Sequence, residues 1–406
     1  MSKAAAAVLL LALPASGWAA NSAYNFSPTA VEGSARAVGT GGSILASPKD
    51  YSAVFVNPAG LGGLAGDGVD FGSDSNSIDN FVVDVSNPKA RALNDPLKFS
   101  FFGFRYVTEN GWGFGFAEQT PYQLDDAFSG TTKVTRGGRG GGTVTGKDST
   151  EIKATTTIYT LAAAKSYLDK RLSVGLAANY IQLSESYDFQ PGLAGGTPVS
   201  HLRATNDAFS ADVGLLAQPY KWLQAAAVFK MGWRVPFEAS RNADALGSNN
   251  LPVQAFRDGK SPDKLSLGLR WAPSRYFSLM TQSNIVFGMK DTAVVGSGLF
   301  PGVDGSLSVG QTTTIDGHWG FEVIPVDEPD LTMKFWAGGY LENTGIQGGY
   351  TRYHRTAGAS FQPWFLGLSM AIDDAELYNN FTVGLGIDML EVAQRVSKKY
   401  GWKLPL

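Results

Sequence analysis

Apolar and polar side chains alternate along most of this chain. From about residue 67 onward, segments of roughly ten residues show the pattern, which is typical of barrel strands. In the segment 223–237, Leu223, Phe229 and Trp233 share one parity, and Gln224 and Lys230 share the other. Because successive side chains of a strand point to opposite faces, one face of such a strand is apolar and the other carries the charge.

The alternation predicts about fourteen strands, the even number that single-chain bacterial barrels require. We place them near 67–75, 97–107, 111–119, 151–166, 171–187, 206–218, 222–237, 263–272, 276–290, 311–324, 331–342, 352–362, 364–373 and 379–390. Short and long connections also alternate. In outer-membrane barrels the short turns face the periplasm, so we expect both termini there.

The predicted fold class is therefore all-β: a 14-stranded antiparallel transmembrane β-barrel. Closure of the barrel satisfies the backbone groups without water, and the apolar faces then meet lipid. Trp112, Trp233, Trp271 and Trp319 have outward parity near strand ends, where membrane interfaces favour tryptophan. A secreted soluble β protein is the alternative, but it gives no reason for sorting loops by length.

Composition excludes several kinds of fold and function. The chain has no cysteine and a formal net charge of -3, which excludes disulfides and thiolate chemistry and argues against a nucleic-acid partner. Residues 1–20 have a basic start, an apolar run and small residues at the end, so we expect a signal peptide cleaved after Ala20. After it, no run of eighteen apolar residues predicts a membrane-spanning helix.

The segment 33–64 differs from everything around it, because Gly, Ala and Ser supply most of its positions. Asn57 is a good helix cap and Pro58 suits a first helical position, so we expect a short helical turn ended by Gly60. We interpret 21–66 as an N-terminal hatch inside the lumen of a barrel formed by 67–390; a loose N-terminal arm is the alternative. Residues 391–406 would form a periplasmic C-terminal tail.

With a hatch and fourteen strands, the chain resembles the FadL-type family of outer-membrane transporters for long-chain fatty acids and other hydrophobic compounds. The sequence resemblance is carried by Ala35-Arg36-Ala37, the run 39–43, Asp50 and Asn57-Pro58-Ala59. It implies passive uptake of a fatty acid or detergent-like ligand through the lumen, an inner pocket near the mature N-terminus and a lateral exit into outer-membrane lipid. Tyr24 and Phe26 would occupy that pocket, or only anchor the terminus. We expect a monomer.

Cations with inward parity are the next candidates, because a fatty-acid carboxylate in a low-dielectric lumen needs a partner. They are Lys230, Arg234, Arg270, Lys334 and His318. The alternative is that they pair with inward carboxylates and only stiffen the barrel; those carboxylates are Asp212, Asp316, Glu322, Asp373 and Asp388. Trp336 and Tyr340 would supply apolar walls beside Lys334.

Three glycines, Gly111, Gly113 and Gly115, share one face of the strand at 111–119. Glycine in a strand marks weak pairing or a close backbone approach, so we expect the hatch to pack there and a lateral gate to open beside it.

Catalysis finds little support. The stretch 141–147 lacks the Ser or Thr that completes a phosphate loop, and His201, His318 and His354 are far apart in the sequence. We expect no catalytic residues, cofactor or metal. Two other functions stay open: a structural or secretion-associated barrel that binds a protein partner, and a general porin.

Overall fold

A computed structural model describes residues 31, 33–62, 68–80, 98–135, 143–190, 200–235, 259–288, 312–328, 330–343, 351–376 and 378–400. The expected signal peptide, Tyr24 and Phe26 lie outside these residues.

Fourteen antiparallel strands form a closed barrel, because β1 pairs with β16 as well as with β2. The strands are β1 (Gly68–Asn80), β2 (Lys98–Val107), β3 (Trp112–Thr135), β4 (Thr143–Tyr167), β5 (Leu172–Gln190), β6 (Ser200–Tyr220), β7 (Leu223–Lys230), β10 (Lys264–Ser274), β11 (Phe277–Val286), β12 (Thr314–Glu328), β13 (Leu331–Asn343), β14 (Thr351–Pro363), β15 (Leu366–Ala375) and β16 (Tyr378–Asp388). The expected fold class is confirmed.

The strand faces divide as the alternation predicts. On β10, Leu267, Leu269 and Trp271 are exposed on the outside, while Ser266 and Arg270 are buried inside. The most exposed apolar side chains form the outer wall, as on β12, where Ile315 is 63% exposed. Such a wall is suited to lipid.

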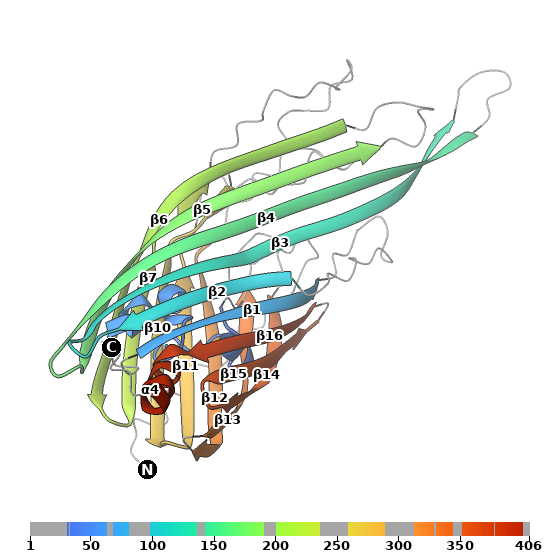
Figure 1. Ribbon diagram of the computed structural model, residues 1–406. Coiled ribbons are helices and arrows are strands. Elements are labelled where there is room, and N and C mark those ends of the chain that lie inside the picture. The colour runs from blue at the N-terminus through green and yellow to red at the C-terminus, as the bar shows by residue number, and fades with distance from the viewer. Residues whose placement is uncertain are drawn as a thin grey trace, which may run out of the picture.

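Several predicted strand boundaries are wrong. β3, β4 and β6 run well past the predicted ends, and β3, β4, β5 and β6 project beyond the other strands (Figure 1). Their outer parts are rich in polar residues on both parities, so no alternation marks them. In contrast, the barrel strand predicted at 222–237 ends at Lys230. Met231 and Gly232 belong to no strand. Within the described residues, β8 (Trp233–Val235) then pairs only with β9 (Gly259–Ser261), in a separate sheet.

The N-terminal segment lies inside the barrel, where it appears as the blue ribbon behind β1, β2 and β3 (Figure 1). It contains α2 (Ala35–Gly39), α3 (Ala53–Val56) and the 3-10 helix η2 (Pro58–Gly62). Asn57 caps η2, since its Oδ1 accepts a hydrogen bond from the Ala59 N–H at 3.0 Å. The predicted turn is confirmed, but it continues to Gly62. We call residues 33–62 the hatch.

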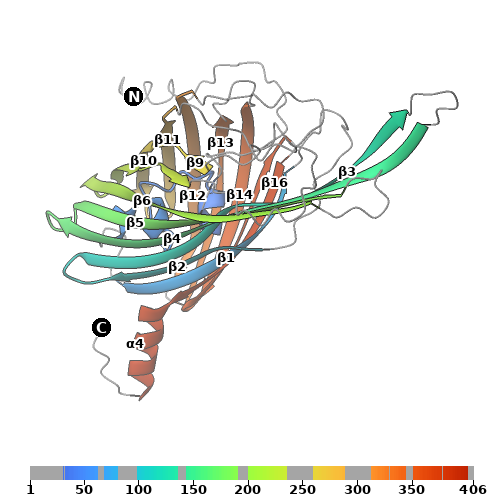
Figure 2. The ribbon, with the colours of Figure 1, turned by 90° about the horizontal axis from the view of Figure 1, so that it is seen from above.

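The barrel has two distinct ends. We call the end with the tight connections, such as Leu168–Arg171 and Arg275–Tyr276, the short-turn end, and the opposite end the long-loop end. At the short-turn end, β16 continues into the helix α4 (Met389–Tyr400), which extends past the strands (Figure 2). Arg395 on α4 pairs with Asp330 at 3.0 Å. Among the described residues, no helix has the length and apolar character needed to cross a membrane.

Candidate functional site

The hatch is seated on glycines that face the lumen from many strands. A side chain at Gly113 of β3 would overlap the carbonyl oxygen of Leu61, and one at Gly175 of β5 would overlap the backbone at Pro58 and Ala59. Hatch backbone comes equally close at Gly103, Gly320 and Gly338, and hatch side chains do so at Gly72, Gly115 and Gly214. Because the hatch lies directly against the wall backbone at these positions, any movement of the hatch has to separate it from the wall.

An apolar cluster holds the hatch to one half of the barrel. Tyr51, Val54 and Leu61 pack with wall residues of β2 to β5, including Phe101 and Ile181. These are buried side chains, and burying a large apolar side chain contributes roughly 1.5–3 kcal/mol. This half of the hatch therefore behaves as part of the protein core.

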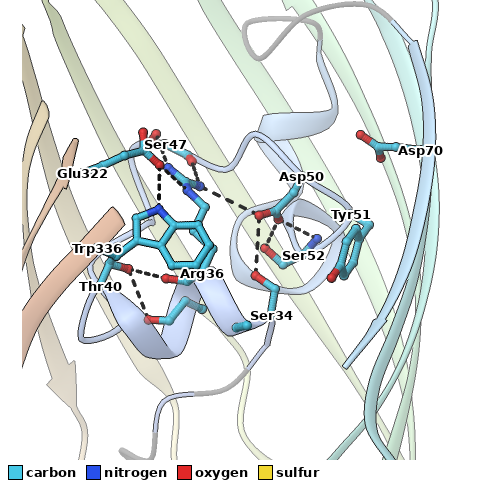
Figure 3. A network of polar contacts seen from close by, with 12 residues as sticks. Ser34, Arg36, Thr40, Ser47, Asp50, Tyr51, Ser52, Asp70, Glu322 and Trp336 are labelled. Atoms are coloured by element: carbon cyan, nitrogen blue, oxygen red, sulfur yellow. Dashed lines mark hydrogen bonds and ion pairs between the residues drawn. The ribbon is translucent and has the colours of Figure 1, made fainter. Parts of the chain in front are cut away.

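A buried ion pair holds the opposite half (Figure 3). The Arg36 Nε donates to Glu322 Oε2 on β12 at 2.9 Å, and the remaining guanidinium nitrogens reach the Ser47 carbonyl and hydroxyl at 2.7 and 3.0 Å. Trp336 donates its indole N–H to the same Glu322 oxygen at 3.1 Å. Burial lowers the pKa of Arg36, but the carboxylates of Glu322 and Asp50 outweigh that effect and raise it overall. Arg36 therefore stays charged and tied to the wall.

Neutral hydrogen bonds complete the attachment on this side. His318 Nδ1 lies 2.7 Å from the Gly41 carbonyl oxygen, which only accepts, so Nδ1 carries the proton. Its Nε2 then accepts from the Asn284 amide at 2.8 Å. Both ring nitrogens are used, and His318 holds the hatch rather than offering a free group to a ligand.

A further anchor lies at β1. The buried Asp74 carboxylate accepts hydrogen bonds from the Ala35 N–H at 2.8 Å and the Tyr51 hydroxyl at 2.7 Å. Burial, followed by the negative charge of Asp74, raises the pKa of Tyr51 well above its usual value. The hydroxyl therefore stays protonated and available as a donor.

A cavity of about 50 Å³ lies on the long-loop side of the hatch. The hatch supplies an apolar floor that includes Ile44, Leu45 and Phe55, while Lys230 and Lys264 reach in from the wall. The two lysines are direct neighbours across β7 and β10. Lys230 Nζ lies 3.5 Å from the centre of the Phe55 ring, a favourable cation–π contact.

The cavity in this arrangement is too small for a hydrophobic ligand. A site of its size holds a few water molecules, whereas ligand pockets are typically about 300–1,000 Å³. Asp316, close to Lys264, is fully buried, and neither carboxylate oxygen has a hydrogen-bond partner within the described residues. The lumen is thus closed below the cavity, and its polar groups are not fully satisfied.

The site residues proposed from the sequence lie in different parts of the molecule. Lys230 and His318 line the cavity, whereas Trp336 lies in the Arg36 network and Lys334 is half-buried at the short-turn end of β13. The prediction that Arg234 lies on a barrel strand is wrong, because it lies exposed on β8, which pairs with β9 in a separate sheet. The outward position expected for Trp233 is also wrong, because Trp233 packs against the apolar cluster inside the barrel. Asn57, Pro58 and Ala59 are buried in the hatch as expected. The hatch position of Asn57 is fixed by its Nδ2, which donates to the Leu45 carbonyl at 3.0 Å.

The three glycines of the expected gate are confirmed as a packing surface for the hatch, but the wall is closed beside them. Gly113 and Gly115 pair with β2 on one side and with β4 on the other. Gly111 lies in the preceding turn with a φ of 74°. The ladder between β3 and β4 is interrupted higher up, between Gln119 and Tyr122, where Pro121 lacks an N–H.

Sequence reasoning missed several residues of the site. Lys264 has inward parity on a predicted strand, and that signal was sufficient to find it. The pairing of Arg36 with Glu322, 286 positions apart, had no signal in the sequence. The same is true of the stacked rings of Tyr340 and His354, whose centroids lie 4.1 Å apart. No group of three or more potential metal ligands occurs among the described residues.

Solved structures share this architecture. The toluene transporter TbuX of Ralstonia pickettii matches with a TM-score of 0.54 and 15% identity over 88% of this chain and 98% of that one. A FadL homologue of Pseudomonas aeruginosa gives 0.52 and 13% over 87% and 98%. The Pseudomonas putida toluene transporter TodX gives 0.53 and 13% over 88% and 99%.

No family model and no curated protein matches the sequence. At such low identity the likeness concerns the fold. The chain therefore has the hatch-filled, fourteen-strand fold of the FadL-type transporters, as its hatch motif and strand pattern indicated.

Proposed function

We propose that the protein is a bacterial outer-membrane transporter that admits hydrophobic small molecules through a lumen closed by the hatch. The observation that carries this proposal is the cavity at the long-loop face of the hatch, with its apolar floor and two wall lysines. The apolar outer wall and the fold shared with toluene transporters and a FadL homologue support it. A hatch that fills the lumen argues against a general porin.

Long-chain fatty acids are the ligand class that best matches the residues lining this cavity, once movement of the hatch has widened it. An alkyl chain is compatible with Ile44, Leu45 and Phe55, and a carboxylate gains from the paired charges of Lys230 and Lys264. Uncharged aromatic compounds would use only the apolar floor. Charge therefore separates the two ligand classes.

The proposed route needs the hatch to move, because a cavity of about 50 Å³ has no room for an alkyl chain. The long-loop end is placed outside the cell and the short-turn end in the periplasm, so both termini are periplasmic. The interruption of the β3–β4 ladder between Gln119 and Tyr122 is the proposed place for a lateral exit. Tyr24 and Phe26 stay the predicted pocket residues near the mature N-terminus.

Uptake measurements with two ligand classes test the proposal. Cells carrying the wild-type protein should accumulate labelled oleate and labelled toluene faster than cells without it. The double variant K230Q/K264Q should lower oleate uptake about tenfold, a loss of roughly 1.4 kcal/mol of binding, and leave toluene uptake unchanged. K221Q, at an exposed position in the turn between β6 and β7, is the matched control.

Three results would contradict the proposal. Uptake of neither ligand would remove the transport function, and loss of secretion on deletion would favour a partner-binding barrel. Equal loss of both ligands in K230Q/K264Q would show that the lysines maintain the hatch rather than select an acid.

A further inference from the structure

Four cations converge on the short-turn face of the hatch, on the side opposite the cavity. Arg36 and Lys49 belong to the hatch, Arg270 to β10 and Lys334 to β13. The four lie close together, because the charges of Arg36, Arg270 and Lys334 all repel that of Lys49, and Arg36 also repels Arg270. Within the described residues, two carboxylates form ion pairs with these cations: Glu322 lies 2.9 Å and Asp50 4.0 Å from Arg36. More cations than ion-paired carboxylates therefore meet at this face.

Three of these cations form no ion pair with a carboxylate of the described residues. Arg36 is committed to Glu322 and Ser47, but Lys49, Arg270 and Lys334 form no ion pair within the described part of the chain. Arg270 is the most telling: it is only 9% exposed, one nitrogen donates to Gln224 at 3.1 Å, and its Nε has no partner among the described residues. A buried charged donor left without an acceptor is costly, and an anion would remove that cost.

Lys49 is the group of this site that an anion from solution can reach. Its side chain is exposed, and it follows Pro48, which packs against Gly60 of η2 at the short-turn end. The surrounding wall and hatch reduce its hydration, and Arg270, Arg36 and Lys334 repel its charge, whereas Glu322 attracts it; the result lowers the pKa of Lys49 to about 8. At neutral pH the ammonium group is therefore still charged but readily neutralised.

We propose that the short-turn face of the hatch, between Lys49, Arg270 and Lys334, is a binding site for one small anionic group such as a carboxylate or a phosphate. The anion comes either from the head of an amphiphile that has passed the hatch or from free solute at this end of the barrel. In the proposed orientation that solute is periplasmic; the site itself does not depend on transport. It is separated from the cavity by the hatch.

Calorimetric titration of the full chain in an uncharged maltoside detergent tests this site. The probes are decanoate, which represents an amphiphile, and inorganic sulfate, which represents a free phosphate-like anion. The wild type should bind at least one of them with one equivalent per chain. K49Q/K334Q should weaken that binding about tenfold. K221Q, at an exposed position, should bind as the wild type does.

A pH series gives a second readout. Sulfate keeps its charge between about pH 6.5 and pH 9.5, so a change in its affinity over this range reports on the protein. Affinity should fall as the pH rises through about 8, where Lys49 loses its proton, and this dependence should be absent from K49Q. The other charged groups that face Lys49 are Arg36, Arg270, Lys334 and the carboxylates of Glu322 and Asp50.

The outcomes are distinct. Binding of decanoate alone assigns the site to amphiphile heads, binding of sulfate alone assigns it to free anions, and binding of both leaves a general anion site. Absence of binding at millimolar concentrations, or equal binding by K49Q/K334Q and the wild type, would overturn the proposal. Because no transport is measured, failure here is separate from failure of the uptake experiment.

Discussion

The hatch meets the barrel in two different ways on its two sides. Toward β2–β5 the contact is apolar and close, with Val54 and Leu61 against glycine backbone and buried side chains. Toward β12 and β13 the hatch backbone is also close, at Gly320 and Gly338, but polar contacts are added there through Arg36–Glu322, the Trp336 indole and His318. Separating the apolar side exposes core, whereas the polar bonds can be exchanged for bonds to water. We therefore expect the hatch to open from the β12–β13 side while the β2–β5 side stays seated.

The largest effect is expected from breaking the polar side. E322A leaves Arg36 buried without its carboxylate, which costs about 3–5 kcal/mol. The hatch should detach on this side, giving a strong rise in ion conductance in planar bilayers and a lower temperature of unfolding. D327A, an exposed carboxylate on the same strand, should leave both unchanged. Unchanged conductance in E322A would show that the ion pair does not hold the hatch.

The apolar side is tested by adding a methyl group. In G113A the new side chain would overlap the Leu61 carbonyl, so the hatch or β3 has to shift, at a cost of about 1–3 kcal/mol. We expect lower stability with a smaller gain in conductance than in E322A. The control is G317A, because a side chain at Gly317 meets nothing within 4 Å. Equal behaviour of G113A and G317A would contradict the close seat.

The smallest effect is expected within the hatch itself. N57A removes the cap of η2 and the bond to the Leu45 carbonyl, and loss of a cap costs about 1 kcal/mol. Unfolding by heat should begin slightly earlier, while conductance stays low because both attachments to the wall remain. A conductance as high as that of E322A would mean that the hatch depends on its internal fold more than on its attachments.

The sequence predicts the lipid-facing part of the barrel well, because a wall with lipid outside and polar lumen inside forces alternation on every strand. It fails where that contrast ends. The outer parts of β3 and β4 are polar on both parities, and the stretch after Lys230 continues the alternation although it no longer pairs with the barrel sheet. A period of two tells the two faces of a strand apart but not whether a neighbouring strand is present.

The candidate site was predicted in part for a similar reason. Parity places Lys230, His318 and Lys334 on the lumen side, but it does not say at which depth the hatch lies. Lys230 lies on the long-loop side of the hatch, His318 contacts the hatch, and Lys334 lies on its short-turn side. The seat of glycines was visible only as the run at Gly111, Gly113 and Gly115. Elsewhere single glycines such as Gly175 and Gly214 mark the seat, and one glycine in a strand has several explanations.

The central claim is that the hatch closes the lumen and has to move for a ligand to pass. The protein has no cysteine, so the double variant L45C/G268C can form only one disulfide; the Leu45 Cβ lies 3.0 Å from the position of a Cβ at Gly268 on β10. Oleate uptake should stop when this pair is oxidised and return on reduction, with L45C and G268C alone as controls. Uptake at the wild-type rate by the oxidised protein would contradict the claim.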